Sequence, residues 1–377
     1  MEGDNSLSRY ADGNLRSCIQ GLRDAENPLN LVIYKDNNSG SGNGLPELFQ
    51  LRPSRKVAGK IDTVYIKRWD VELNSADPEV ITEVLNLAFG KFDSEVRGVE
   101  FWSHGMSWIP SANYRTSDRQ TSLTRAQNYI GQDNSDYTEI WQLRDALQKV
   151  NYPIDYLMFD ACYMATAEVL YELRSTCQYI LASCTEIMGD GFPYRDMIMS
   201  LSKAQGQDQL LTALRLAFDD YRQLYLNNGT FSLLCTSGAE KLYEACRSLA
   251  NASDYDMLSA DRFWFDASLQ HYGRYRANSR YYFYDLADWA GVLGTCLNTT
   301  QYDEAIAEAL HECVDQSYFS RIFTEGVEPL EIDRSCGLAL SVPQLWPLHE
   351  MYATVPNMTT AKLDDAYTRL QWQITSK

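Results

Sequence analysis

Long apolar runs, basic charge and histidine are all scarce in this sequence, and the first two shortages exclude whole classes of protein. No stretch approaches the roughly 18 consecutive apolar residues of a membrane-spanning helix, so we expect no transmembrane segment. Lys and Arg number 33 against 51 Asp and Glu, which gives a formal net charge of −18. Binding to a phosphate backbone needs clustered positive charge, so nucleic acid is not an expected partner.

Familiar catalytic and metal-binding motifs are also missing. The sequence contains no C-x-x-C pair, no G-x-S-x-G elbow, no P-loop, no H-E-x-x-H and no calcium loop of the type D-x-[DN]-x-[DN]-G. The nine cysteines include at least one free thiol, and most are expected to be small buried side chains. The start, MEGDNSLSRYADGN, has neither a basic nor an apolar signal region. We expect the mature form of an extracellular or periplasmic protein whose signal peptide has been removed.

Apolar runs alternate with helical patterns along the first two thirds of the chain. Strands are predicted at residues 30–36, 61–69, 96–105, 155–161, 179–186 and 230–237, and helices at 77–89, 137–150, 166–174 and 208–225. This alternation is typical of an α/β domain around a mostly parallel sheet. Later segments are richer in aromatic residues, so we expect an α/β core over 1–250. A C-terminal α+β subdomain over 251–377 would pack on it, with its aromatic residues forming core.

Only four histidines are present, and one of them stands out. His311 lies in a helical pattern, His349 in a loop with Trp and Pro, and His271 in an aromatic segment, so structural roles are expected for these three. His104 instead ends the strand VEFW and precedes Gly105, a residue type that permits close backbone approach. His104 is therefore the candidate catalytic base.

The candidate nucleophile is Cys162, in the segment DYLMFDACYMA. Cys162 ends the strand that follows the one ending at His104, and the carboxyl ends of parallel strands meet at one edge of a sheet. An imidazole beside a thiol is the arrangement that covalent catalysis needs. The backbone N–H groups of Gly105 and Cys162 lie at strand ends, where amides are free, and are the expected oxyanion donors.

In these residues the sequence resembles the clostripain family of caspase-like cysteine peptidases. The motifs FWSHG and DYLMFDACYMA carry the similarity, which extends along GQDNSDYTEIWQLRDAL and ILASCTEIMGDGFPY. It covers residues 31–194 well and the C-terminal third weakly. The resemblance implies a caspase-like α/β/α sandwich, a dyad of Cys162 and His104, and cleavage after basic residues. No cofactor is required by the sequence, and calcium enters only by family analogy, because some members depend on it.

The resemblance also assigns two acids to substrate binding. Asp160 lies two residues before Cys162, on the same side of the strand, where a carboxylate would oppose thiolate formation. In clostripain-like enzymes the acid at this motif position lines the pocket for the basic side chain, and Asp190 in MGDGFPY resembles the second acid. Two carboxylates could clamp a guanidinium. The alternatives are a structural hydrogen bond for Asp160 and a turn role for Asp190, with Glu186 as a reserve candidate.

Residues 106–137 form an unusually long polar segment without periodicity, of a length that is commonly functional or disordered. Arg115, Arg119 and Arg125 in this loop are candidate points of self-cleavage. The leading interpretation is a cysteine endopeptidase that cleaves peptides or proteins after Arg or Lys. The alternative is a catalytically silent caspase-like binding module, and a third interpretation is an unrelated cysteine amidase acting on small substrates.

Overall fold

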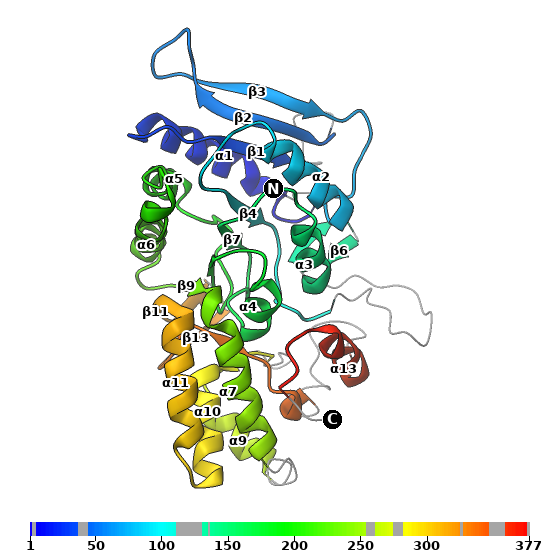
Figure 1. Ribbon diagram of the computed structural model, residues 1–377, viewed down its shortest axis with the longest axis vertical. Coiled ribbons are helices and arrows are strands. Elements are labelled where there is room, and N and C mark those ends of the chain that lie inside the picture. The colour runs from blue at the N-terminus through cyan, green and yellow to red at the C-terminus, as the bar shows by residue number, and fades with distance from the viewer. Residues whose placement is uncertain are drawn as a thin grey trace.

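A computed structural model describes most of the chain (Figure 1). The residues outside the description are 2–4, 37–43, 111–129, 135, 254–260, 274–281, 325–326, 347–358 and 375–377.

The centre of the molecule is a five-stranded sheet in the order β11–β9–β8–β7–β4. Its strands are β4 (Gly98–Trp102), β7 (Tyr156–Asp160), β8 (Tyr179–Ala182), β9 (Thr230–Cys235) and β11 (Val314–Phe319). β4, β7 and β8 run parallel, whereas β9 and β11 pair antiparallel with their neighbours. The two candidate catalytic residues follow β4 and β7, which are thus adjacent and parallel. The last residue pair of these two strands is Trp102 opposite Asp160.

Two hydrophobic clusters cover the two faces of this sheet. Along β7, Leu157 and Phe159 belong to one cluster and Met158 to the other, as the alternation of side chains in a strand requires. The first face is covered by α2 (Pro78–Phe89), α3 (Ile140–Gln148), α4 (Ala167–Leu173) and α7 (Ala239–Ala252). The second is covered by α1 (Ser8–Asp24), α5 (Tyr194–Leu201) and α6 (Gln207–Leu224). The expected α/β/α sandwich is confirmed. Its central sheet is parallel from β4 to β8 and antiparallel from β8 to β11.

The first predicted strands belong to a second sheet. β1 (Leu31–Lys35) and β3 (Ile61–Arg68) pair antiparallel with β2 (Glu47–Pro53), and this sheet lies next to α1 at one end of the molecule (Figure 1). Neither β2 nor α1 was predicted from the sequence. The buried face of α1 includes Asn14 and Gly21, which are not the large apolar residues by which a helix pattern is recognised.

The C-terminal third packs on the first face and shares its hydrophobic cluster. It contains α9 (Arg262–Ser268), α10 (Leu286–Leu297), α11 (Gln301–Cys313), α13 (Thr360–Arg369), β10 (Tyr284–Asp285), β12 (Ile322–Thr324), β13 (Val327–Leu330) and β14 (Ala339–Leu340). It also supplies β11, the edge strand of the central sheet. Several of its aromatic side chains are buried, as expected, among them Tyr272, Phe283 and Tyr284. The boundary near residue 250 stays a prediction. None of the helices described is long and apolar enough to cross a membrane.

Candidate active site

The segments after β4 and β7 lie directly against each other. The Ser103 N–H donates to the carbonyl of Asp160 at 3.4 Å, which continues the ladder past the strand ends. A Cβ atom at Gly105 would lie 2.7 Å from the carbonyl oxygen of Cys162 and 2.9 Å from the Cβ of Ala161. Only glycine allows this approach. His104 and Cys162, predicted from separate motifs, therefore flank one tight backbone contact at the carboxyl edge of the parallel strands.

A strained turn presents the thiol. Tyr163, directly after Cys162, has φ of 60°, which is uncommon for a residue with a Cβ and costs energy. Its N–H donates to the carbonyl of Thr185 at 2.9 Å, and the Ala165 N–H donates to that of Ser183 at 2.9 Å. These bonds hold the turn against the end of β8. Cys162 is half-buried, and its Sγ accepts from the Ile187 N–H at 3.4 Å.

His104 is held by residues from two distant segments. Its carbonyl accepts from the Gly131 N–H at 3.1 Å, in β5 (Ile130–Asp133), which pairs with β6 (Asp136–Thr138). Its Nε2 lies 2.9 Å from the Ser6 hydroxyl oxygen. Asn5 fixes this contact, because its amide donates to the carbonyl of Gln132 at 3.0 Å. Burial lowers the pKa of His104, which favours the neutral imidazole that can accept a proton.

Ser6 is a further functional candidate, which no motif in the sequence marks. It lies 98 positions from His104 in the chain, and neither its residue type nor its spacing marks it. The contact exists only because α1, which begins two residues later, packs across the central sheet.

Asp160 is a buried carboxylate with two hydrogen-bond donors. It is 6% exposed and accepts from the Tyr194 hydroxyl at 2.6 Å and from the Phe192 N–H at 3.1 Å. Burial raises its pKa to about 6, and these two bonds counter part of that effect. Gly191 packs so closely on Asp160 that a Cβ there would collide with the carboxylate.

The second predicted acid lies in the same loop but at the surface. Asp190 is exposed and lies two residues before Phe192, whose N–H donates to Asp160. The loop is fixed by the Tyr225 hydroxyl, which donates to the carbonyl of Gly191 at 2.6 Å. Glu186, the reserve candidate, is half-buried where this loop leaves β8. The fold thus brings the loop of Asp190 into contact with Asp160 through Phe192 and Gly191, with Asp190 itself exposed.

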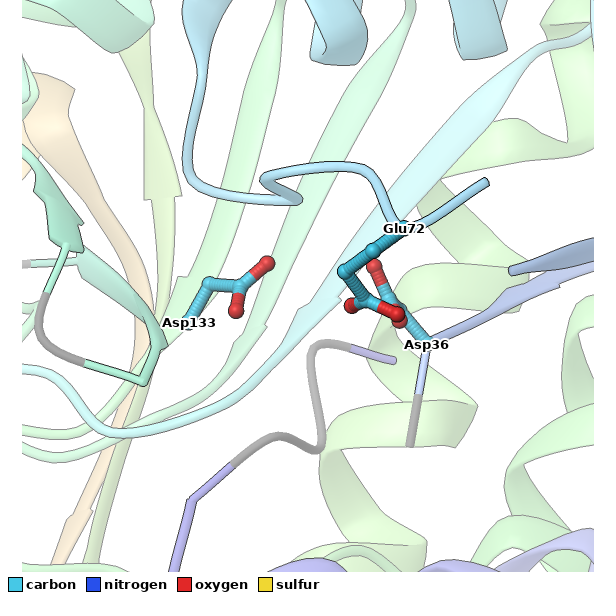
Figure 2. Close-up of side chains that lie close together, drawn as sticks. All are labelled: Asp36, Glu72 and Asp133. Atoms are coloured by element: carbon cyan, nitrogen blue, oxygen red, sulfur yellow. The ribbon is translucent and has the colours of Figure 1, made fainter. Parts of the chain in front are cut away.

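A cluster of oxygen ligands lies near β5. Carboxylate oxygens of Asp36, Glu72 and Asp133 all lie within 4.8 Å of one another, and the three side chains approach one another from separate segments (Figure 2). Asp36 and Asp133 are buried and Glu72 is exposed. This donor set suits a hard cation such as Ca²⁺, so the chain has residues of the right chemistry for the calcium that the resemblance allows. Calcium itself stays an expectation.

The C-terminal third supports both segments that carry the candidate catalytic residues. Phe283 stacks on Tyr163, with ring centroids 5.7 Å apart, and the Ala339 N–H donates to the carbonyl of Ala165 at 3.0 Å. On the His104 side, the indole of Trp108 donates to the Ser341 hydroxyl at 2.8 Å. Aromatic residues of this region therefore hold the turn that carries Cys162.

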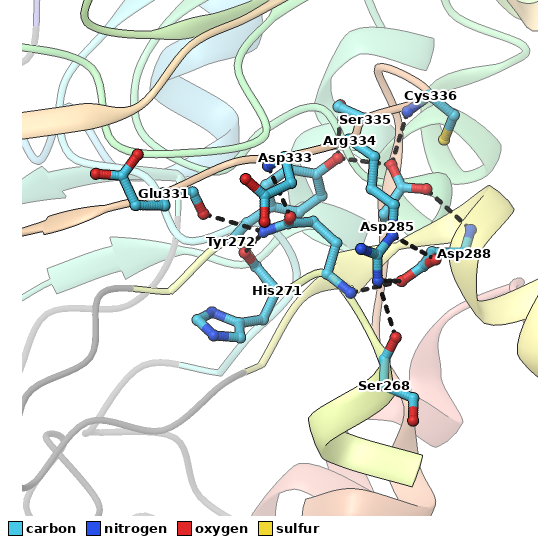
Figure 3. Close-up of polar contacts among 11 residues, drawn as sticks. Ser268, His271, Tyr272, Asp285, Asp288, Glu331, Asp333, Arg334, Ser335 and Cys336 are labelled. Atoms are coloured by element: carbon cyan, nitrogen blue, oxygen red, sulfur yellow. Dashed lines mark hydrogen bonds and ion pairs between the residues drawn. The ribbon is translucent and has the colours of Figure 1, made fainter. Parts of the chain in front are cut away.

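A polar network fixes the strand next to Phe283. Asp285 accepts from the Tyr272 hydroxyl and from the Cys336 N–H, both at 2.7 Å, and Arg334 forms two hydrogen bonds to the Asp288 carboxylate (Figure 3). Figure 3 also shows His271 at the margin of this network. The Nδ1 atom of His271 lies 2.9 Å from a backbone carbonyl, consistent with a structural role.

Some predicted residues fall outside the description. Arg115, Arg119 and Arg125, the candidate self-cleavage points, lie outside the described residues, as does His349. His311 lies on α11, as its helical pattern predicted.

Comparisons with known proteins identify a family and similar folds. The profile of the clostripain family, peptidase C11, matches residues 1–372. Clostripain from Hathewaya histolytica is 25% identical over 227 residues, which are 54% of this chain and 41% of that protein. The chain thus spans less than half the length of this curated relative.

Solved structures match over nearly the whole chain. An inactive zymogen C11 protease from Parabacteroides distasonis is 26% identical with a TM-score of 0.76, covering 98% of this chain and 94% of that one. A secreted C11 cysteine protease from Bacteroides thetaiotaomicron, solved with an irreversible peptide inhibitor, is 23% identical with a TM-score of 0.73, covering 99% and 95%. The second likeness concerns the fold alone.

Proposed function

Because the chain belongs to the clostripain family of cysteine proteases, we propose that it is an endopeptidase in which Cys162 attacks the peptide bond that follows an Arg or Lys. One observation carries the proposal. The backbone of Gly105 packs on that of Cys162, so the imidazole that precedes this glycine and the thiol stand at adjacent ends of parallel strands. No cofactor is needed for this chemistry, and no step passes through a metal.

The reaction proceeds through an acyl-enzyme. Neutral His104 accepts the thiol proton of Cys162, and the thiolate attacks the carbonyl carbon of the substrate. The N–H groups of Gly105 and Cys162 donate to the negative charge that develops on the carbonyl oxygen. The imidazolium then protonates the leaving amine, so that the C–N bond breaks. A water molecule, deprotonated by His104, hydrolyses the thioester and releases the acid product.

The preference for a basic residue comes from the acids on the loop side of β7. Asp160 lies two residues from the nucleophile and ionises in a site of low polarity, where attraction to a guanidinium or ammonium is strong. Asp190 lies in the loop that contacts Asp160, so a movement of this loop would bring a second carboxylate to the Arg or Lys side chain of the substrate. Self-processing within residues 106–137 and a location outside the cytoplasm belong to the same proposal.

A panel of short fluorogenic peptides that differ only in the residue before the reporter amide tests the proposal. The parent should hydrolyse the Arg or Lys members, Cys162→Ala should hydrolyse none, and Cys296→Ala, which removes another half-buried thiol, should match the parent. Turnover that survives in Cys162→Ala would refute the mechanism. A parent that binds the peptides without turnover would favour the silent binding module.

Asp160→Asn tests the pocket separately. We expect the ratio of kcat/KM for Arg over a neutral residue to fall at least tenfold, since the variant removes the charge but keeps the shape. An unchanged ratio would remove Asp160 from the pocket.

A further inference from the structure

A second carboxylate lies behind Asp160 and shares its hydrogen-bond partner. Glu100, on β4, lines a hollow of about 290 Å³ together with Tyr156, Tyr194 and mostly apolar side chains. The Tyr194 hydroxyl is within hydrogen-bonding distance of both Glu100 and Asp160. Glu100 is an exposed residue by its surface area, and that surface faces this hollow, whose mostly apolar lining gives the carboxyl few polar neighbours.

One hydroxyl proton cannot serve both acids. A tyrosine hydroxyl has one proton to donate and an oxygen that can accept. If both carboxylates were ionised, one of them would face the Tyr194 oxygen without a proton between them, and two like charges would lie beside one hydroxyl. Both contacts are satisfied only if one of the two carboxyl groups is protonated and donates to Tyr194.

No basic side chain among the described residues forms an ion pair with either acid. The titratable groups that face the two carboxyls from the surrounding elements are Cys18 on α1, Tyr156 on β7, Tyr221 on α6, Tyr225 after α6, and the amino group of Met1. The first four are neutral at physiological pH. Arg97 also lines the hollow but forms no ion pair with either carboxyl, so no described basic side chain pairs with the two anions.

We propose that Glu100 carries a proton at neutral pH and donates it to the Tyr194 oxygen, so that Tyr194 donates its own proton to Asp160 and keeps that carboxylate ionised and oriented. Glu100 and Tyr194 are then positioning residues for the recognition of a basic side chain. The inference rests on the proposed function, because it takes Asp160 as the acid that contacts the substrate.

The order of the two ionisations agrees with this arrangement. Burial, and next the charge of Asp160, raise the pKa of Glu100 to about 8, whereas that of Asp160 is about 6. Asp160 also has the Phe192 N–H as a second donor, which favours the negative charge there. Between these two values Glu100 is neutral and Asp160 is charged. The basic-residue preference should disappear as the pH falls through about 6.

A titration that needs no proteolysis tests the protonation of Glu100. The full chain with Cys162→Ala is labelled with ¹³C at the glutamate carboxyl groups, and its resonances are followed by NMR from pH 4 to pH 10. We expect one resonance with a midpoint near pH 8 that is absent when Glu100→Gln is added. A midpoint below about 5 for that resonance would overturn the inference.

The pH profile of specificity tests its consequence. The readout is the ratio of kcat/KM for an Arg peptide to that for the same peptide with citrulline, which is neutral and similar in shape. Glu100→Gln keeps a donor toward Tyr194 and should leave the acid midpoint of this ratio unchanged. If Glu100 were ionised, the same variant would remove a negative charge and move the midpoint to lower pH, which would contradict the inference.

Tyr194→Phe should move that midpoint upward by about one pH unit, since Asp160 loses a donor to its charged form. The preference for Arg should fall at pH 6.5 and return at pH 8, a recovery that a merely damaged pocket would not show. A pH-independent loss would contradict the relay. An unchanged ratio in Asp160→Asn would refute the pocket itself, whereas a low midpoint for Glu100 would refute only the relay, so the two failures are distinguishable.

Discussion

At the level of single residues, the proposed chemistry depends on how the ring of His104 is held. The Ser6 hydroxyl lies 2.9 Å from Nε2, and a hydrogen bond there fixes the orientation of the imidazole and the nitrogen that carries the proton. In hydrolases with an imidazole base, a third group commonly plays this part. Ser6 is exposed, so its contribution should be modest.

Replacement of Ser6 measures that contribution. A hydrogen bond of this kind is worth about 0.5–1.5 kcal/mol, so Ser6→Ala should lower kcat about threefold to tenfold with little change in KM, and Ser6→Thr should restore most of the loss. Steady-state kinetics on an Arg peptide give both constants. A rise in kcat would show instead that Ser6 obstructs the imidazole.

The residues that could be predicted from the sequence are those with local signals. His104 and Cys162 follow apolar strands, and Gly105 and Asp160 lie within two residues of them, so motif and spacing are sufficient. The roles proposed for Ser6, Tyr194 and Glu100 rest on contacts between segments that are far apart in the chain. No periodicity encodes such contacts, because tertiary packing alone brings these side chains together.

Among the secondary-structure elements, the junction of β4 and β7 is the least tolerant of change. The Cβ of Ala at position 105 would meet backbone atoms of Cys162, which cannot rotate away. Gly105→Ala should therefore lower kcat/KM by about 100-fold, the scale expected for a displacement of about 1 Å in a catalytic group. The matched control is Gly291→Ala on α10, where nothing lies within 4 Å of the added carbon.

Activity of the two glycine variants is compared after circular dichroism has established that both are folded. Gly291→Ala should be as active as the parent and at least as stable, since Ala favours a helix over Gly. Equal activity in the two variants would contradict the close packing of the strand ends.

Helix α4 contains a buried acid whose charge should weaken the fold. Glu168, in its first turn, is fully buried and accepts from the Ser341 N–H, and burial raises its pKa to about 7. The carboxyl group of Glu168 loses its proton at a lower pH in the unfolded chain than in the folded chain. Its contribution therefore lowers the free energy of unfolding as the pH rises toward 7, and the loss of stability persists above pH 7. Glu168→Gln should raise the melting temperature at pH 8 by about 1–3 °C.

The difference between Glu168→Gln and the parent should shrink at pH 5, where the folded parent is already protonated. Thermal melts of both proteins at the two pH values measure it. A variant that is less stable than the parent at pH 8 would mean that the charged form of Glu168 is favoured.

For the whole molecule, the central question is whether the C-terminal third is a separate unit. One hydrophobic cluster contains Ile81, Phe159, Phe283 and Trp372, and the C-terminal third supplies an edge strand of the central sheet. Segments that share one core unfold together. We therefore expect tryptophan fluorescence and far-UV circular dichroism to report one coincident denaturant transition. Two separated transitions would contradict this expectation.

Phe283→Ala should affect both stability and catalysis. The loss of a buried phenylalanine costs about 3–5 kcal/mol, and the side chain also supports Tyr163, which follows the proposed nucleophile Cys162. We expect a lower denaturation midpoint and, in the folded variant, a reduced kcat. A destabilised variant with unchanged kcat would mean that this contact contributes only to stability.

For the whole molecule, the sequence predicted the strands and helices better than it predicted which strands pair with one another. Alternating strand and helix patterns indicated an α/β domain and most of its elements, and the family resemblance implied the sandwich. They could not show that the strands at 31–35 and 61–68 leave the central sheet, nor that residues 314–319 join it. Strand pairing depends on which faces remain to be buried once the helices pack, and that is a property of the complete fold.

Covalent labelling tests the central claim most directly. The full chain is incubated with a peptide acyloxymethyl ketone that carries Arg next to the reactive carbon, and the modified residue is located by mass spectrometry of the digested protein. The account predicts a single adduct on Cys162 that is lost in His104→Ala, is strongly reduced in Asp160→Asn, and does not form with the matched Glu probe. An adduct on another thiol, or equal labelling by the Arg and Glu probes, would contradict it.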